Sequence, residues 1–148
     1  MRKTAALVGV GLVLAACSST VQGAASPLGA DGTQSYASVK DLYDDIVDGG
    51  ISCDNLQPQP DNGEGAEFAH CELAQGDQLA LAVWQSSGGR DAGLSQIRSA
   101  LDDLDIVYCL VVGRGDSGRW SINVGDALEV CEDIGSDLGG RLVKSAGA

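Results

Sequence analysis

The chain has 148 residues, of which 44% are hydrophobic, and its 21 acidic and 9 basic residues give a formal net charge of −12 at pH 7. This length suits one domain with a buried core, so several domains are not expected. A surface with this much negative charge repels nucleic acids and anionic lipid headgroups, which excludes a nucleic-acid partner. We interpret the acidic surface as a source of solubility.

The first sixteen residues are arranged like a bacterial export signal. Arg2 and Lys3 precede an uncharged stretch over residues 4–14, which is too short to span the core of a bilayer. Residues 14–17 then read Leu-Ala-Ala-Cys, and this segment resembles the lipobox of bacterial lipoproteins. The alternative is an ordinary secretory signal followed by a chance cysteine.

The lipobox resemblance implies three modifications around Cys17. The signal peptide, residues 1–16, is cleaved off, the thiol of Cys17 receives diacylglycerol, and the new amino group is acylated with a chain such as palmitate. Several acyl chains together hold a protein stably on a membrane. The resemblance therefore implies a lipid-anchored protein on the extracytoplasmic face of the cell membrane, with the membrane as its partner through Cys17.

The rest of the chain is expected to divide into a tether and one domain. Residues 17–36 are rich in Ser, Thr, Gly and Ala, which is typical of a flexible linker. Residues 37–148 carry the periodic patterns of secondary structure and are predicted to form the domain.

A helix and a hairpin are predicted in the first part of this domain. Ser38 has the chemistry of an N-cap, with Asp41 three residues later, and Gly49-Gly50 ends the apolar helical pattern. Residues 51–53 begin a short strand, and residues 55–66 have the composition of a loop. The segments 67–73 and 78–84 are predicted to pair as an antiparallel hairpin.

The second part is predicted to repeat this scheme. After a loop over residues 86–90, leucine and isoleucine side chains at spacings of three and four indicate a helix over residues 94–104. Residues 107–112 are predicted to form a buried strand, and the turn 113–118 closes a hairpin between it and residues 120–124. Asp126 is expected to cap a third helix, which ends at Gly139-Gly140. Residues 141–144 are predicted to add a short edge strand.

Together these elements predict an α+β fold. We expect a single antiparallel sheet of four to five strands, with about three helices packed on one face.

Four cysteines remain once Cys17 is assigned to lipid, and in an exported protein an even number indicates disulfides. Four cysteines allow three pairings, and we predict the two that are local in sequence. Cys131 lies on the apolar face of the last predicted helix, which is expected to cover the strand that holds Cys109. Cys53 and Cys71 bracket the 55–66 loop. No familiar zinc-ligand spacing occurs among them, and no metal or other cofactor is expected.

The domain also resembles a loose class of small lipoproteins and secreted domains of high-GC Gram-positive, actinobacterial origin. The matching features are the opening helix, Gly50-x-x-Cys53, Cys71 at a strand edge, the strand entry at residues 118–122, and the last helix closed by Gly139-Gly140. This resemblance implies no catalytic chemistry and therefore assigns no active residues.

Two short segments resemble parts of chymotrypsin-like serine proteases. Residues 69–71, Ala-His-Cys, match the surroundings of their catalytic histidine, and residues 115–118, Gly-Asp-Ser-Gly, match those of their catalytic serine. The order of His70 before Ser117, with aspartates between them, also fits a triad. However, the domain is too short for two six-stranded barrels, so a serine hydrolase using His70 and Ser117 is the alternative hypothesis rather than the main one.

The same predicted turn contains Arg114-Gly115-Asp116, which resembles the integrin-recognition motif of adhesion proteins. A tight hairpin would present this tripeptide as a recognition tip, which gives a second alternative, an adhesin. The simpler interpretation is a turn that uses Gly and Asp for their backbone freedom.

The main prediction is a non-enzymatic binding or interaction module of the cell envelope. Its contact surface is expected on the sheet face or the loop over residues 54–66, and its partner is an envelope protein or a small-molecule ligand.

Overall fold

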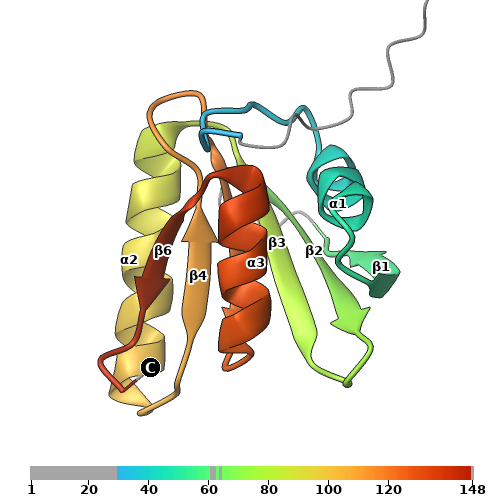
Figure 1. Ribbon diagram of the computed structural model, residues 1–148. Helices are drawn as coiled ribbons and strands as arrows, with labels where there is room; N and C mark the ends of the chain where they lie inside the picture. The colour runs from blue at the N-terminus through green and yellow to red at the C-terminus, as the bar shows by residue number, and fades with distance from the viewer. Residues whose placement is uncertain (1–29, 61–62, 64, 148) are drawn as a thin grey trace, which may run out of the picture.

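The computed structural model describes residues 30–60, 63 and 65–147, and Cys17 and most of the predicted tether therefore lie outside the described residues. In the described part, six strands form one antiparallel sheet in the order β1-β2-β3-β5-β4-β6, accompanied by three helices (Figure 1). None of the described helices is long and apolar enough to cross a membrane.

Along the chain, one helix precedes three strands, a second precedes two strands and a third precedes the last strand. The helices are α1 (Val39–Asp48), α2 (Ser87–Asp103) and α3 (Leu128–Leu138). The strands are β1 (Cys53–Pro58), β2 (Ala66–Leu73), β3 (Gln78–Trp84), β4 (Cys109–Val112), β5 (Trp120–Gly125) and β6 (Arg141–Lys144). Both predicted hairpins, β2–β3 and β4–β5, are present as antiparallel pairs.

Helices α1 and α3 cover one face of the sheet, which we call the front face (Figure 1). The main core lies between this face and the two helices. Leu42 and Ile46 of α1 and Ile134 of α3 pack there against buried residues of five strands, β1 to β5. Trp120, fully buried at the start of β5, belongs to the same core. The alternation of inward and outward side chains along β2 and β3 follows from the two-residue period of a strand.

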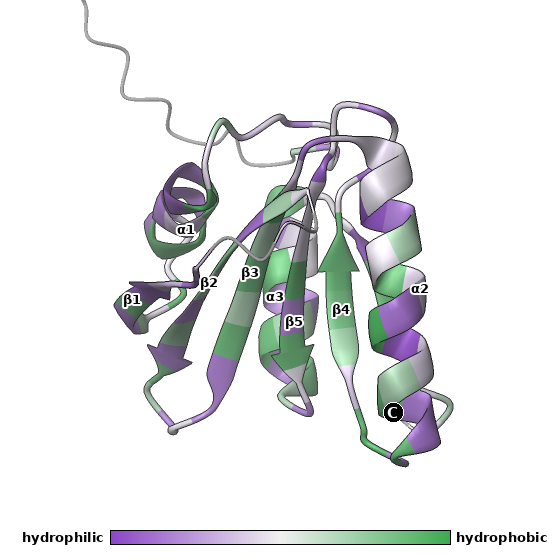
Figure 2. Ribbon diagram, turned by 180° about the vertical axis from the view of Figure 1, so that it is seen from behind, coloured by the Kyte–Doolittle hydropathy of each residue, from purple (hydrophilic) through white to green (hydrophobic). Residues whose placement is uncertain are grey.

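The prediction of helices on one face is wrong for α2. Leu94 of α2 packs against Leu110 and Val112 of β4, which point away from the front core, and the view from behind shows α2 beside β4 on the back face (Figure 2). Because all four residues of β4 are buried, this strand is covered on both faces. A continuous apolar run such as residues 107–112 signals this double burial but does not say which helix supplies the second cover.

Both disulfides predicted from the sequence are present. Cys53 and Cys71 join β1 to β2 with their Cα atoms 5.5 Å apart, and Cys109 and Cys131 join β4 to α3 with a Cα separation of 6.2 Å. All four cysteines belong to the front core.

The ends of several elements differ from the prediction. Strand β1 continues through Pro58 into the expected loop, because an edge strand tolerates proline and a bulge between Asp54 and Gln57 absorbs the irregular pairing. Helix α2 starts at Ser87, inside the expected loop, because Ser86 caps it by accepting a hydrogen bond from the Gly89 amide. The sheet has six strands rather than the expected four to five, with β1 and β6 as its two edges.

The caps of α1 and α3 also bear on the predictions. Ser38 and Asp41 form the predicted capping box, and Gly139 ends α3 in a left-handed conformation. Helix α3 instead has Ala127 at its N-cap with no side-chain hydrogen bond, so the expectation that Asp126 caps it is wrong.

The residues just before α1 pack against the domain. The Trp120 indole N–H donates to the carbonyl of Gln34 at 3.1 Å, and the Gln34 side chain donates to the carbonyl of Leu138 at 2.9 Å. The Arg114 amide donates to the carbonyl of Gly32. Packing against the domain therefore begins by Gly32, several residues before the boundary predicted at residue 37.

Candidate functional site

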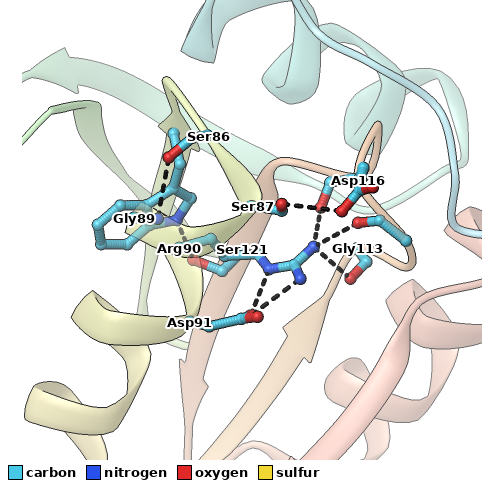
Figure 3. A network of polar contacts seen from close by, with 11 residues as sticks. Ser86, Ser87, Gly89, Arg90, Asp91, Gly113, Asp116 and Ser121 are labelled. Atoms are coloured by element: carbon cyan, nitrogen blue, oxygen red, sulfur yellow. Dashed lines mark hydrogen bonds and ion pairs between the residues drawn. The ribbon is translucent and has the colours of Figure 1, made fainter.

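The turn over residues 113–118, which joins β4 to β5, carries most of the sequence motifs and is held by a buried arginine. Arg90 of α2 is 6% exposed, and its Nη1 donates to the carbonyls of Gly113, Gly115 and Gly118 at 3.0, 3.1 and 2.5 Å. Figure 3 shows the guanidinium pointing into the concave side of the turn. Such charge-assisted hydrogen bonds are stronger than neutral ones, so Arg90 fixes the shape of the turn.

The charge of Arg90 is balanced next to it. The carboxylate of Asp91 accepts from Nε at 2.9 Å and lies 2.9 Å from Nη2 (Figure 3). The Asp91 side chain remains 62% exposed. A buried guanidinium without such partners would carry a large desolvation cost. Arg90 is therefore a satisfied structural cation, and the sequence analysis did not single it out.

Close backbone contacts also fix the turn. A Cβ atom at Gly118 would clash with the backbone nitrogen of Arg114 and would lie only 2.5 Å from the carbonyl oxygens of Arg114 and Gly32. Glycine is therefore required there by space, which explains one of the two glycines in the Gly-Asp-Ser-Gly segment without catalysis.

The charged side chains of the predicted recognition tip form hydrogen bonds to neighbouring parts of the domain. The Arg114 guanidinium donates to the carbonyls of Gly139 and Gly140 at 2.8 and 3.4 Å. Asp116 accepts from the hydroxyl of Ser87 at 3.0 Å (Figure 3). Both residues are exposed but tied to different neighbours, Arg114 to the end of α3 and Asp116 to the start of α2. Each charge of the tripeptide is therefore held by a hydrogen bond to another segment of the domain.

His70 and Ser117 are not brought together. His70 of β2 pairs with Ala80 of β3, and Ala80 pairs in turn with Asn123 of β5. The start of β5 at Trp120 is three residues further along, so at a rise of ~3.4 Å per residue and a strand spacing of ~4.8 Å it lies roughly 14 Å from His70. Ser117 lies beyond that point, in the turn held by Arg90. Proton transfer needs a separation of ~3 Å, or one bridging water.

Two surface hollows lie near this turn. The first, which we call the Trp84 hollow, has a volume of about 460 Å³ and is lined by nine residues: Tyr36, Ala37, Gln59, Ala66, Glu67, Val83, Trp84, Gln85 and Arg119. It lies where the predicted contact loop meets the sheet. Trp84 is largely buried, packs edge-on against Phe68, and donates from its indole N–H to the hydroxyl of Ser121 at 3.0 Å.

The second hollow, which we call the arginine hollow, has a volume of about 470 Å³ and lies on the back face between α2, β4 and β6. Arg90, Arg98, Arg114 and Arg141 line it, together with apolar side chains and Asp91. The sequence analysis missed this gathering because its members come from three separate segments. The spacing of Arg90, Leu94 and Arg98 at every fourth residue of a helix was the available signal.

Other charged groups on the domain form local pairs. Burial, and then a hydrogen bond to Asp45 at 2.7 Å, raise the pKa of Tyr36 above its ordinary range. The hydrogen bond from Lys144 at 2.7 Å, and its charge, lower the pKa of Glu132. No group of His, Cys, Asp and Glu side chains able to hold a metal ion occurs within residues 30–60, 63 and 65–147.

Comparison with known proteins gives no match for this chain among protein-family models, curated proteins or solved structures.

Proposed function

We propose that this protein is a lipid-anchored lipoprotein of the bacterial envelope whose domain is a non-enzymatic binding module on the extracytoplasmic face of the membrane. The observation that carries the anchor is the Leu-Ala-Ala-Cys segment at residues 14–17, which follows a charged start and a short uncharged stretch. Lipid on Cys17 is the attachment.

The two disulfides support export. Both have Cα separations inside the ordinary range for disulfides, 5.5 and 6.2 Å, and both pair cysteines that are buried in the front core. Disulfides persist in oxidising compartments outside the cytoplasm and are rare inside it. An address beyond the cytoplasmic membrane agrees with this chemistry.

The anchor is tested by metabolic labelling of the full chain with radioactive palmitate in a bacterial host. We expect the wild-type chain to incorporate label and to sediment with membranes, and Cys17→Ala to lose both properties. Ser18→Ala, which changes the neighbouring residue, is the control and should still be labelled. Absence of label from the wild-type chain, or equal label in Cys17→Ala, would refute the anchor.

The separation of His70 from Ser117 supports the choice of a binding module over a hydrolase. The folded full chain, treated with a fluorophosphonate that reacts with activated serines, should remain unlabelled. Labelling that disappears in Ser117→Ala would overturn this part of the proposal in favour of the hydrolase.

The two hollows near the turn are contact surfaces that support a binding role. Each is large enough for a small ligand, since ligand pockets are usually ~300–1,000 Å³. The Trp84 hollow adjoins the loop that the sequence favoured as a contact surface, and the arginine hollow lies on the back face beside α2.

A further inference from the structure

The arginine hollow reverses the charge balance of the protein. The whole chain has more than twice as many acidic as basic residues. Yet four arginines are among the residues that line this one hollow, and Asp91 is the one acidic residue among the described residues that line it. A concave surface lined by one sign of charge concentrates the electrostatic field and attracts ions of the opposite sign.

The fold explains why these arginines meet. Arg90 and Arg98 lie two turns apart on the side of α2 that also carries Leu94, the residue packed against β4. Arg141 of β6 pairs directly with Val112 of β4, so both side chains lie on the back face. Arg114 reaches the same hollow from the turn that follows β4.

Among the described residues, three of these four arginines lack a carboxylate at ion-pair distance, although the charge of Asp102 acts on Arg98 and that of Asp31 acts on Arg114. In the described part of the chain Arg90 forms an ion pair with Asp91, whereas Arg98, Arg114 and Arg141 form no ion pair within 4.0 Å. Arg114 is nevertheless held in place by the carbonyls of Gly139 and Gly140. Arg98 lies beside the buried Tyr108, and the hydrogen bond between their side chains raises the pKa of the guanidinium.

The rest of the lining includes the apolar side chains of Leu94, Leu110, Val112 and Val143, together with Ser95 and two glycines. Leu110 of β4 pairs with Val143 of β6, and both belong with Leu94 to the back core. These side chains line the space between the arginines. The hollow thus combines an apolar lining with several guanidinium groups, which is the usual composition of a site for an organic ligand that carries charge.

We propose that the arginine hollow binds a small organic anion, in which a carboxylate or phosphate group is attached to an apolar portion. The planar guanidinium fork matches the oxygen geometry of both groups, and two forks can share one anion. The apolar portion rests on Leu94, Leu110 and Val143. This inference rests on the proposed binding module and gives it a ligand class.

The test is calorimetric titration of the full chain, purified in a nonionic detergent, with detergent solution alone as the blank. The probes are phenyl phosphate, benzoate and the neutral benzyl alcohol. We expect saturable one-to-one binding of at least one of the two anions and none of benzyl alcohol, and the stronger anion identifies whether phosphate or carboxylate is preferred. No saturable binding of either anion would overturn the proposal.

Variants then locate the site. Arg98→Gln and Arg141→Gln should each weaken binding of the preferred anion about tenfold or more, because each removes a charge-assisted contact. Lys40→Gln removes one exposed positive charge from α1, which lies on the front face, and should leave the affinity unchanged. Equal weakening in all three variants would show that the anion responds only to the net charge of the protein. That result would also overturn the proposed site.

The outcomes separate this inference from the anchor. Palmitate labelling at Cys17 depends on residues outside the domain, so it tests the lipoprotein proposal whether or not an anion binds. Loss of anion binding with intact labelling refutes the arginine hollow alone, and loss of labelling with intact binding refutes the anchor alone.

Discussion

Replacement of the buried Arg90 by methionine is the most informative perturbation of this fold. Methionine keeps an unbranched apolar stem, although a shorter one, and removes the donors to three turn carbonyls. Two of those hydrogen bonds, to Gly113 and Gly118, are buried. A hydrogen bond from a charged group contributes ~1.5–3 kcal/mol, and loss of one partner from a buried ionic network costs ~3–5 kcal/mol. The released Asp91 is mostly exposed and adds little.

We therefore expect Arg90→Met to lower the free energy of unfolding by about 3–5 kcal/mol. Urea unfolding of the full chain, followed by the fluorescence of the buried Trp84 and Trp120, measures this loss. Amide exchange at Gly118, whose N–H donates to the Arg114 carbonyl, reports the turn itself and should accelerate. Arg119→Met is the control, because its hydrogen bond to the Gln85 carbonyl is exposed. A loss below about 1 kcal/mol, with Gly118 exchange unchanged, would refute the role assigned to Arg90.

Three further predictions concern packing, disulfides and pH. A Cβ atom at position 93 would clash with the ring of Trp84, so Gly93→Ala should lower the free energy of unfolding by about 1–3 kcal/mol. Gly88→Ala on the same helix meets no atom within 4 Å and should be neutral or stabilising. The midpoints of urea unfolding measure both effects. Replacing Cys109 and Cys131 together by serine removes a bridge with a sequence separation of 22 and should cost about 3 kcal/mol in non-reducing urea unfolding. Because Lys144 lowers the pKa of folded Glu132, this pair stabilises the fold above the ordinary carboxyl pKa of ~4.3 and loses its effect as the pH falls through the lowered value. Glu132→Gln should accordingly reduce thermal stability at pH 7, and this difference should shrink as the pH falls below the ordinary carboxyl pKa; a difference that does not change with pH would contradict the assignment.

Local patterns in the sequence predicted most of the individual elements. The capping box of α1, the hairpin pairing of β2 with β3, the turn at residues 113–118 and both disulfides follow from spacing, turn composition and cysteine order. These features depend on residues that are close together in the chain. Periodicity and cap chemistry therefore carry enough information to identify them.

The side of the sheet that α2 covers could not be predicted in the same way. The continuous apolar run of β4 indicated burial, but the choice of α2 for the back face depends on the order of strands. The start of α2 was not predicted, because Gly88 and Gly89 are poor helix formers. The N-cap hydrogen bond of Ser86 stabilises this first turn in spite of the two glycines.

The arginine hollow was likewise outside the reach of sequence patterns. Arg98 and Arg141 become neighbours only when the β4–β6 register and the face covered by α2 are known. By contrast, the protease-like and integrin-like segments were visible in the sequence, but the fold keeps His70 away from Ser117 and ties Arg114 and Asp116 to opposite sides of the turn.

The position of β5 determines when the domain can assemble during synthesis. This strand is next to last in the chain, yet it lies in the middle of the sheet and supplies pairing to both β3 and β4. Until residues 120–125 have emerged, the sheet exists as two unconnected parts, β1-β2-β3 and β4 alone, and the front core lacks Trp120. The nascent chain therefore gains its cooperative stability in one late step, so a truncation before residue 120 should leave a chain that cannot fold rather than a smaller domain.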